Sequence, residues 1–175
     1  QGDLIRHFGA KPVTAEFSEV MNQVRNGHVD CAITGGLSGN AIGLHEVTSH
    51  ISPLAVNWGL SMFGANLPAW QALPPEVRTT LQTALPKLEA AIWADAEAQN
   101  QQGLLCNTGR PGCQQGKPGR MQVVPLTSAD QTALQAAIRT SVIPSWLQRC
   151  GAGCAGVWNR LLAPVTGMTT VAPVP

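Results

Sequence analysis

The residues of this chain that could take part in chemistry gather around one glycine-rich turn. Gly35 and Gly36 separate an apolar run that ends at Thr34 from a helical pattern that begins near Asn40. A turn between a strand and a helix presents free backbone amides, and such amides suit an anion. The turn lacks the Gly-Lys-Ser/Thr ending of a phosphate-binding loop, and tight-turn geometry alone also explains its glycines. Two interpretations therefore stay open, an anion-binding turn and a purely structural one.

Residues with catalytic potential are few. The sequence contains no GxSxG, HExxH or Walker motif. Cys31, His45 and His50 are one possible set of a nucleophile and a base near the turn. We expect Cys31 to be a buried, inert thiol within a strand, because burial makes a thiolate costly. The sequence therefore favours a binding protein over an enzyme, with no catalytic residue, no metal and no cofactor.

Two aromatic residues could pack on the carbon skeleton of a ligand. Phe17 lies on an apolar stripe with helical spacing, and Trp58 lies in a candidate strand over residues 57–66. An aromatic residue in such a pattern is usually a core residue. From the pattern alone, a core role and a ligand contact are both possible for each.

Helical and strand-like segments alternate along the chain. Helices are expected over residues 2–8, from a cap at Thr14 to about Asn26, over 40–47, from Pro75 to about 100 with a kink at Pro86, from a cap at Ser128 to about 150, and over 155–162. Strands are expected over residues 9–14, 29–34, 50–54, 57–66 and 121–126. This order predicts an α/β lobe with a mixed sheet flanked by helices and one long kinked helix.

The composition argues against several classes of partner. The chain has 175 residues, 44% of them hydrophobic, and a formal net charge of +1. Nucleic acids and anionic membranes need a concentrated basic surface, so neither is expected to bind. No apolar run reaches the roughly 18 residues that span a bilayer. The first six residues do not resemble a signal peptide, and the helix expected at residue 2 suggests that the chain begins within a longer protein.

Four of the five cysteines form two closely spaced pairs. Cys106 and Cys113 flank a loop of Gly, Pro and Asn, and Cys150 and Cys154 flank Gly-Ala-Gly. Such pairs predict two disulfides and an oxidising compartment. Zinc binding and unpaired thiols are the alternatives, although the spacings do not match the CxxC pattern of zinc knuckles.

Several short motifs together resemble one known family. Three of them, separated by short gaps, are Phe8-Gly9-Ala10-Lys11-Pro12-Val13, Phe17-Ser18-Glu19-Val20 and Gly27-His28-Val29-Asp30. They are similar to the Gly-Ala-x-Pro, Phe-Ser-Glu-Val and Gly-x-Val-Asp-Gly motifs of the solute-binding proteins of tripartite ATP-independent periplasmic (TRAP) transporters, the DctP family. Residues 44–47 and 73–77 resemble that family's Leu/Phe-Tyr-Glu-Val and Leu-Pro-x-Asp/Glu-Val motifs. The resemblance covers about residues 1–104 and corresponds to the C-terminal half of the family.

The resemblance implies a type II periplasmic binding fold, in which two α/β lobes close on a small ligand, usually an organic acid. It implies that residues 1–104 form the C-terminal ligand-binding lobe and the long helix. Residues 105–175 would then supply a disulfide-bearing loop, a strand and C-terminal helices that pack on the lobes. A first lobe, with an arginine that holds the ligand carboxylate, is expected before Gln1. The partners would be membrane permease subunits in the periplasm, or, as the alternative, a signalling protein that reads the ligand.

The resemblance also assigns ligand-binding residues. Phe17 matches an aromatic residue that lines the family's cleft, and Trp58 lies near a strand position that often contacts the ligand. Thr34 stands where many members place an asparagine, and Gly35 would add a backbone amide. This chain has Val-Asp-Cys in place of Val-Asp-Gly, and Thr34-Gly35-Gly36 in place of Glu-Asn-Pro. A hydroxyl and backbone amides would replace an amide side chain, so the ligand class stays open.

The cysteine spacing generates the first testable prediction. Peptide mapping by mass spectrometry without reduction should recover Cys106 linked to Cys113 and Cys150 linked to Cys154, with Cys31 unlinked. A disulfide that closes so short a loop stabilises the folded protein only modestly, by roughly 2–3 kcal/mol according to the loop-entropy estimate. Recovery of four free thiols, or of Cys106 linked to Cys150, would contradict the assignment.

Overall fold

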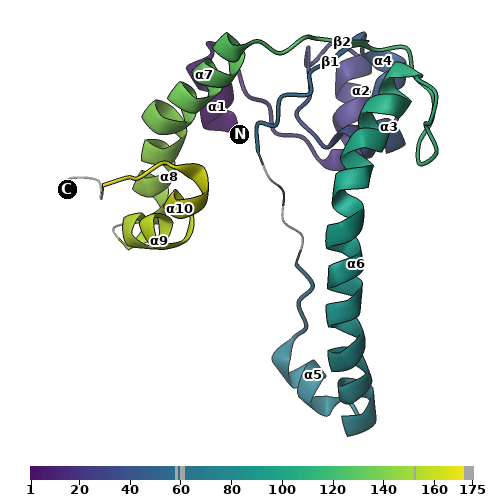
Figure 1. The fold of residues 1–175 in the computed structure, drawn as a ribbon, viewed down its shortest axis with the longest axis vertical. Helices are drawn as coiled ribbons and strands as arrows, with labels where there is room; N and C mark the ends of the chain where they lie inside the picture. Colours follow the sequence, from purple (N-terminus) through teal and green to yellow (C-terminus); the bar gives the residue numbers. More distant parts are fainter. Residues whose placement is uncertain (58, 60–61, 152, 172–175) are drawn as a thin grey trace. The chain divides into compact units, whose positions relative to one another are not determined.

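A computed structural model of the chain describes residues 1–57, 59, 62–151 and 153–171. The described chain is mostly helical and divides into two compact units (Figure 1). The first unit combines residues 1–15, 54–57 and 125–175, and the second combines residues 16–53 and 58–124. The predicted functional division between residues 104 and 105 stays a prediction.

The second unit carries the predicted ligand-binding residues. Its helices are the 3-10 helix η1 (Phe17–Glu19), α2 (Val20–Arg25), α3 (Gly36–Ala41), α4 (Leu44–Val47), α5 (Leu67–Ala72) and α6 (Pro75–Thr108). Its strands are β1 (His50–Ile51) and β2 (Gln122–Val123). In Figure 1, α5 lies beside the beginning of α6, whereas α3 lies beside its end.

The long helix α6 begins as the sequence predicts and ends later. Pro75 occupies its first turn, where proline is tolerated because the missing N–H has no helical partner. The helix continues across Pro86 without interruption, and a kink there stays a prediction. Its last residue is Thr108. Gly109 then caps the helix in the left-handed conformation, with a φ of 65°, which glycine adopts without strain. Cys106 therefore lies in the helix and not in the loop that the sequence predicts.

The predicted mixed sheet is wrong for the described residues, where the only strand pairing is a two-stranded parallel one. His50 pairs with Gln122 and Ile51 with Val123. Residues 9–14, 29–34 and 62–66 are not strands. A strand needs a neighbour for its backbone N–H and C=O groups, and these segments lack one among the described residues. Thr14 likewise does not cap a helix, because Glu16 precedes η1 and caps it without a side-chain hydrogen bond.

Two glycines allow α3 to approach α6 closely. A Cβ atom on Gly103 would lie 2.6 Å from the amide nitrogen of Leu37 and 2.8 Å from the carbonyl carbon of Gly36. Real Cβ atoms do not come that close to backbone atoms, which cannot move aside as a flexible side chain can. The position of α3 therefore depends on the absence of a side chain at residue 103.

The first unit is a helical cluster with an apolar core. Its helices are α1 (Gly2–His7), α7 (Ser128–Ala137), the π-helix η2 (Ile138–Val142), α8 (Ile143–Cys150), α9 (Cys154–Leu161) and α10 (Ala163–Thr166). Leu4 packs with Leu134 and Ala137. Ile143 and Leu147 pack with Ala155 of α9 and with Met168, which follows α10. The Cys150–Cys154 disulfide joins α8 to α9.

Thr127, and not Ser128, caps α7. The Thr127 hydroxyl accepts a hydrogen bond from the Asp130 amide, and the Asp130 carboxylate accepts one from the Thr127 amide in return. This reciprocal arrangement is a capping box. The hydrogen bonds from the Thr127 backbone and hydroxyl lower the pKa of Asp130 because they favour its charged form.

An ion pair links α1 to α8 within the first unit. Arg149 Nη2 lies 2.6 Å from Asp3 Oδ2, and Arg6 Nη2 lies 2.8 Å from Asp3 Oδ1. The hydrogen bonds from Arg149 and then from Arg6 lower the pKa of the Asp3 carboxyl. The carboxylate is therefore bound to α8 by charge as well as by a hydrogen bond.

The close approach of α3 and α6 predicts the effect of one added methyl group. Gly103→Ala should destabilise the second unit by about 1–3 kcal/mol, because the new Cβ forces the helices apart. Gly156→Ala is the matched control, since it also adds a Cβ inside a helix but meets nothing within 4 Å. That control should be neutral or stabilise by up to about 1 kcal/mol. Thermal unfolding of both variants tests the prediction, and equal midpoints would contradict it.

The Asp3 ion pair predicts a stability difference that depends on pH. The folded-state pKa of Asp3 is lowered, so its contribution is complete above the ordinary aspartate pKa of about 4 and is lost as the pH falls through the lowered value. Asp3→Asn should therefore lower the unfolding midpoint at pH 7 and have little effect in strong acid. Glu89→Gln, which removes an exposed acid with no ion pair in the described part of the chain, is the control. If the unfolding midpoint of Asp3→Asn differs from that of the unchanged protein by the same amount at every pH, this assignment is contradicted.

Candidate ligand-binding site

Three of the four predicted ligand-binding residues lie in described parts of the second unit. Phe17 begins η1 and is half exposed, so it is not a core residue of this unit. Thr34 and Gly35 are exposed and directly precede α3. Trp58, the fourth, lies outside the described residues. Among the described residues no hydrogen bond joins Phe17 to Thr34, so their joint action on one ligand stays a prediction.

The turn before α3 offers neutral hydrogen-bonding groups. Gly35 is the N-cap of α3 in an extended conformation, and no side chain caps the helix. The first amides of a helix have no partner within the helix, so those of the first turn of α3 that do not face Gly103, as Leu37 does, can bond another acceptor. The Thr34 hydroxyl has no hydrogen-bond partner in the described part of the chain and can donate or accept. Together these groups can satisfy ligand oxygens without a charged side chain.

Two buried asparagines hold α3 in place. Asn40, in α3, is fully buried, and Asn107, near the end of α6, is 3% exposed. Asn40 Nδ2 donates to Asn107 Oδ1 at 3.1 Å, and Asn107 Nδ2 donates to the Gly36 carbonyl at 2.8 Å. The Asn107 bond therefore fixes the first turn of α3, directly beside Thr34 and Gly35.

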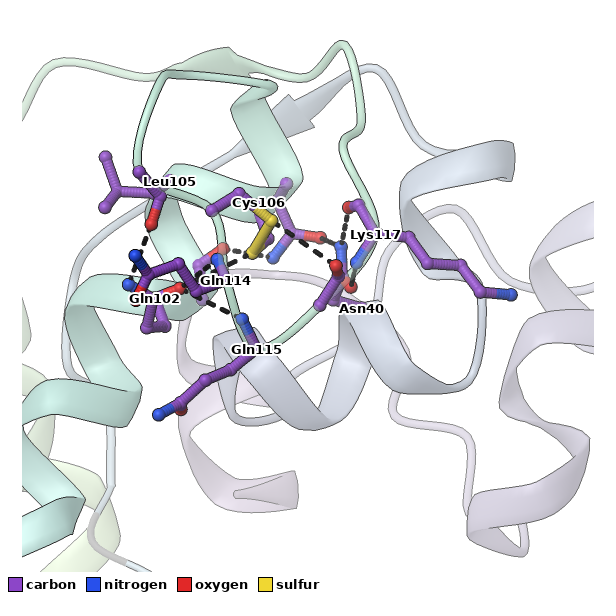
Figure 2. Close-up of a disulfide and its surroundings, with 12 residues drawn as sticks. Asn40, Gln102, Leu105, Cys106, Gln114, Gln115 and Lys117 are labelled. Atoms are coloured by element: carbon purple, nitrogen blue, oxygen red, sulfur yellow. Dashed lines mark hydrogen bonds between the residues drawn. A yellow bond between two sulfur atoms is a disulfide. The ribbon is translucent and has the colours of Figure 1, made fainter.

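The loop after α6 is bound to the same pair. Lys117 donates its amide to Asn40 Oδ1 at 2.7 Å, and its carbonyl accepts from Asn40 Nδ2 at 2.8 Å. Figure 2 shows the Asn40 side chain between the Lys117 backbone and the disulfide region, with the Lys117 side chain extending away. Every polar atom of the buried Asn40 amide thus has a partner, as burial of an amide requires.

The Cys106–Cys113 disulfide joins the last turn of α6 to this loop. Gln102 supports the same connection, because its side-chain oxygen accepts from the amides of Gln114 and Gln115 and its nitrogen donates to the Gly112 carbonyl (Figure 2). The four paired sulfurs of the chain form two disulfides, so they offer no thiolate set for zinc.

The predicted burial of Cys31 is wrong. This residue is exposed, because residues 29–34 form no buried strand, and its thiol is in no disulfide. His50 hydrogen-bonds Ser49 through Nδ1, and the His45 side chain is 6% exposed and lies 3.9 Å from Glu46. No hydrogen bond links Cys31 to either histidine in the described residues, so the three do not form a nucleophile and base there.

The sequence did not reveal the asparagine pair or the residues that surround His45. Asn40 and Asn107 are 67 positions apart, and no local pattern relates them. The available signal was the occurrence of Asn40 in a helix with no other amide or charged side chain, which is unfavourable unless the side chain has a partner.

Comparison with models of protein families assigns the chain to one family. The model of the bacterial extracellular solute-binding protein family 7, DctP, matches residues 1–146. The chain belongs to this family. Comparisons with curated proteins and with solved structures each found no match.

Membership of the DctP family indicates the general role, the cellular location and the fold. It is the family of TRAP-type solute-binding proteins, which are periplasmic and bind solutes instead of transforming them. Its members have the type II periplasmic binding fold, and the helices and parallel strand pair fit part of such an α/β lobe. Among the described residues, no helix is long and apolar enough to cross a membrane.

Proposed function

We propose that this DctP protein captures a small organic acid in the periplasm and delivers it to the membrane permease subunits of a TRAP transporter. The family match over residues 1–146 is the observation that carries the proposal. The two disulfides support it, because such bridges persist in oxidising compartments like the periplasm. The absence of catalytic activity is part of the proposal.

The proposed site uses neutral groups of the second unit. The Thr34 hydroxyl and the amides beside Gly35 would satisfy ligand oxygens, while Phe17 and Trp58 would pack on the carbon skeleton. The exposure of Thr34, Gly35 and Phe17 supports this role, because a ligand residue must be reachable. The rigid attachment of α3 supports it too, since a fixed turn loses little freedom when the ligand binds.

A carboxylate ligand also needs a positive partner. We expect this partner to be an arginine of a first lobe that precedes Gln1, as the resemblance to the DctP family implies, where it would hold the carboxylate by a two-pronged hydrogen bond. Closure of the two lobes would bury the ligand and present the loaded protein to the permease, as hinge closure does in other binding proteins.

The proposed site predicts how two substitutions change affinity in a protein that contains both lobes. Phe17→Ala should weaken binding of the organic acid about 5- to 30-fold through lost apolar contact. Thr34→Ala should weaken it about 2- to 10-fold through a lost hydrogen bond, whereas Thr34→Ser should keep the hydroxyl and most of the affinity. Calorimetry against a panel of small organic acids is the measurement.

Two controls separate the site from the fold. Phe8→Ala removes another half-exposed aromatic, at the end of α1, and should leave affinity unchanged. Residues 1–175 alone should bind at least about 30-fold more weakly than the two-lobed protein, because one partner of a desolvated charge pair is missing. If Phe17→Ala lowers the unfolding temperature but leaves affinity intact, Phe17 is structural and the proposed site is wrong.

A further inference from the structure

A second polar region lies on the second unit, and its described lining contains none of the predicted ligand residues. A pocket of about 630 Å³ lies between α4 and the loop that precedes β2. Its described lining comes from His45, Glu46, Thr48, Ser49 and residues 117–120, and it includes none of Phe17, Thr34 or Gly35. A volume of this size falls within the range of small-molecule sites.

A buried imidazole without a partner lies in the wall of this pocket. The His45 side chain is only 6% exposed, and its Nδ1 is buried with no hydrogen bond in the described part of the chain. The loop causes this burial, because a Cβ atom on Gly119 would lie 2.9 Å from the Cβ of His45. A buried polar atom without a partner is costly, so a group that bonds this atom would stabilise the structure.

The charges around the pocket favour an anion as that partner. Glu46 is the acidic residue of the lining, and its carboxylate has two basic neighbours, because Arg25 Nη2 lies 3.8 Å from Oε2 and His45 Nε2 lies 3.9 Å from Oε1. Lys117 and Arg120 also line the pocket, and neither forms an ion pair with a described residue. The two cations are therefore uncompensated there, while the acid already has basic neighbours.

The remaining polar groups of the lining are largely occupied. The Thr48 hydroxyl donates to the Leu44 carbonyl at 2.6 Å, and the Ser49 hydroxyl pairs with His50 Nδ1 at 2.8 Å. The free hydrogen-bonding groups are then the His45 ring, the Lys117 ammonium and the Arg120 guanidinium. An ammonium and a guanidinium can only donate, so the matching ligand is an acceptor-rich anion.

We propose that this pocket binds a small oxyanion, a phosphate or carboxylate group, between His45, Lys117 and Arg120. The backbone of Lys117 is held by Asn40, so its ammonium is presented from a fixed base. Figure 2 shows this side chain directed away from the disulfide and its hydrogen bonds. The site is separate from the proposed organic-acid site and does not depend on a first lobe.

The test uses the chain of 175 residues and its histidine NMR signals. Inorganic phosphate, and separately succinate, are titrated at constant ionic strength set with chloride. The ring signals of His45 should shift and saturate with at least one of these anions, and the anion that succeeds identifies the accepted oxyanion. Lys117→Ala and Arg120→Ala should each weaken that binding about fivefold, and both bonds of the Lys117 backbone to Asn40 should survive the substitution.

One matched variant completes the design. Arg110→Ala removes an exposed cation of the same loop that does not line the pocket, and it should leave the anion affinity unchanged. The His45 signals report on this pocket and not on the turn at Thr34 and Gly35, so failure of this inference and failure of the proposed function are distinguishable. The inference is overturned if the His45 signals respond to neither anion, or if Arg110→Ala weakens binding as much as the pocket variants do.

Discussion

The arrangement of the second unit depends on one buried side-chain amide. Asn40 has no contact with solvent, yet it bonds the Asn107 side chain on α6 and both backbone groups of Lys117 in the following loop. A buried amide with a missing partner costs roughly 1–3 kcal/mol, so each of these three segments stabilises the arrangement of the other two. The first turn of α3, the end of α6 and the disulfide-bearing loop are thereby one structural feature.

This dependence explains why the glycines and the disulfide occur where they do. The Asn40–Asn107 bond requires α3 to approach α6 closely, and a side chain at Gly103 would prevent that approach. The loop must then turn back from α6 to reach Asn40. The Cys106–Cys113 disulfide limits the freedom of its first part, which lowers the entropy lost when the loop is ordered.

The sequence predicted local features well and distant ones poorly. The start of α6 at Pro75, the disulfide pairs and α9 follow from local signals such as proline position and cysteine spacing. The strand expected over residues 29–34 failed because a strand depends on neighbours that its own residues do not specify. The predicted burial of Cys31 failed with it, because this residue is exposed. The exposure of Phe17 could not be predicted either, because the same stripe suits a core and a cleft.

The two polar regions of the second unit differ in how they would recognise an anion. The turn at Thr34 and Gly35 offers neutral donors on a backbone fixed by Asn107, so its selectivity would come from geometry. The pocket at Lys117 and Arg120 offers flexible cations, whose attraction is less selective and weakens with salt. Discrimination among organic acids would therefore belong to the turn, because a fixed donor rejects a ligand whose oxygens are misplaced. The pocket would respond mainly to the charge and local concentration of an anion.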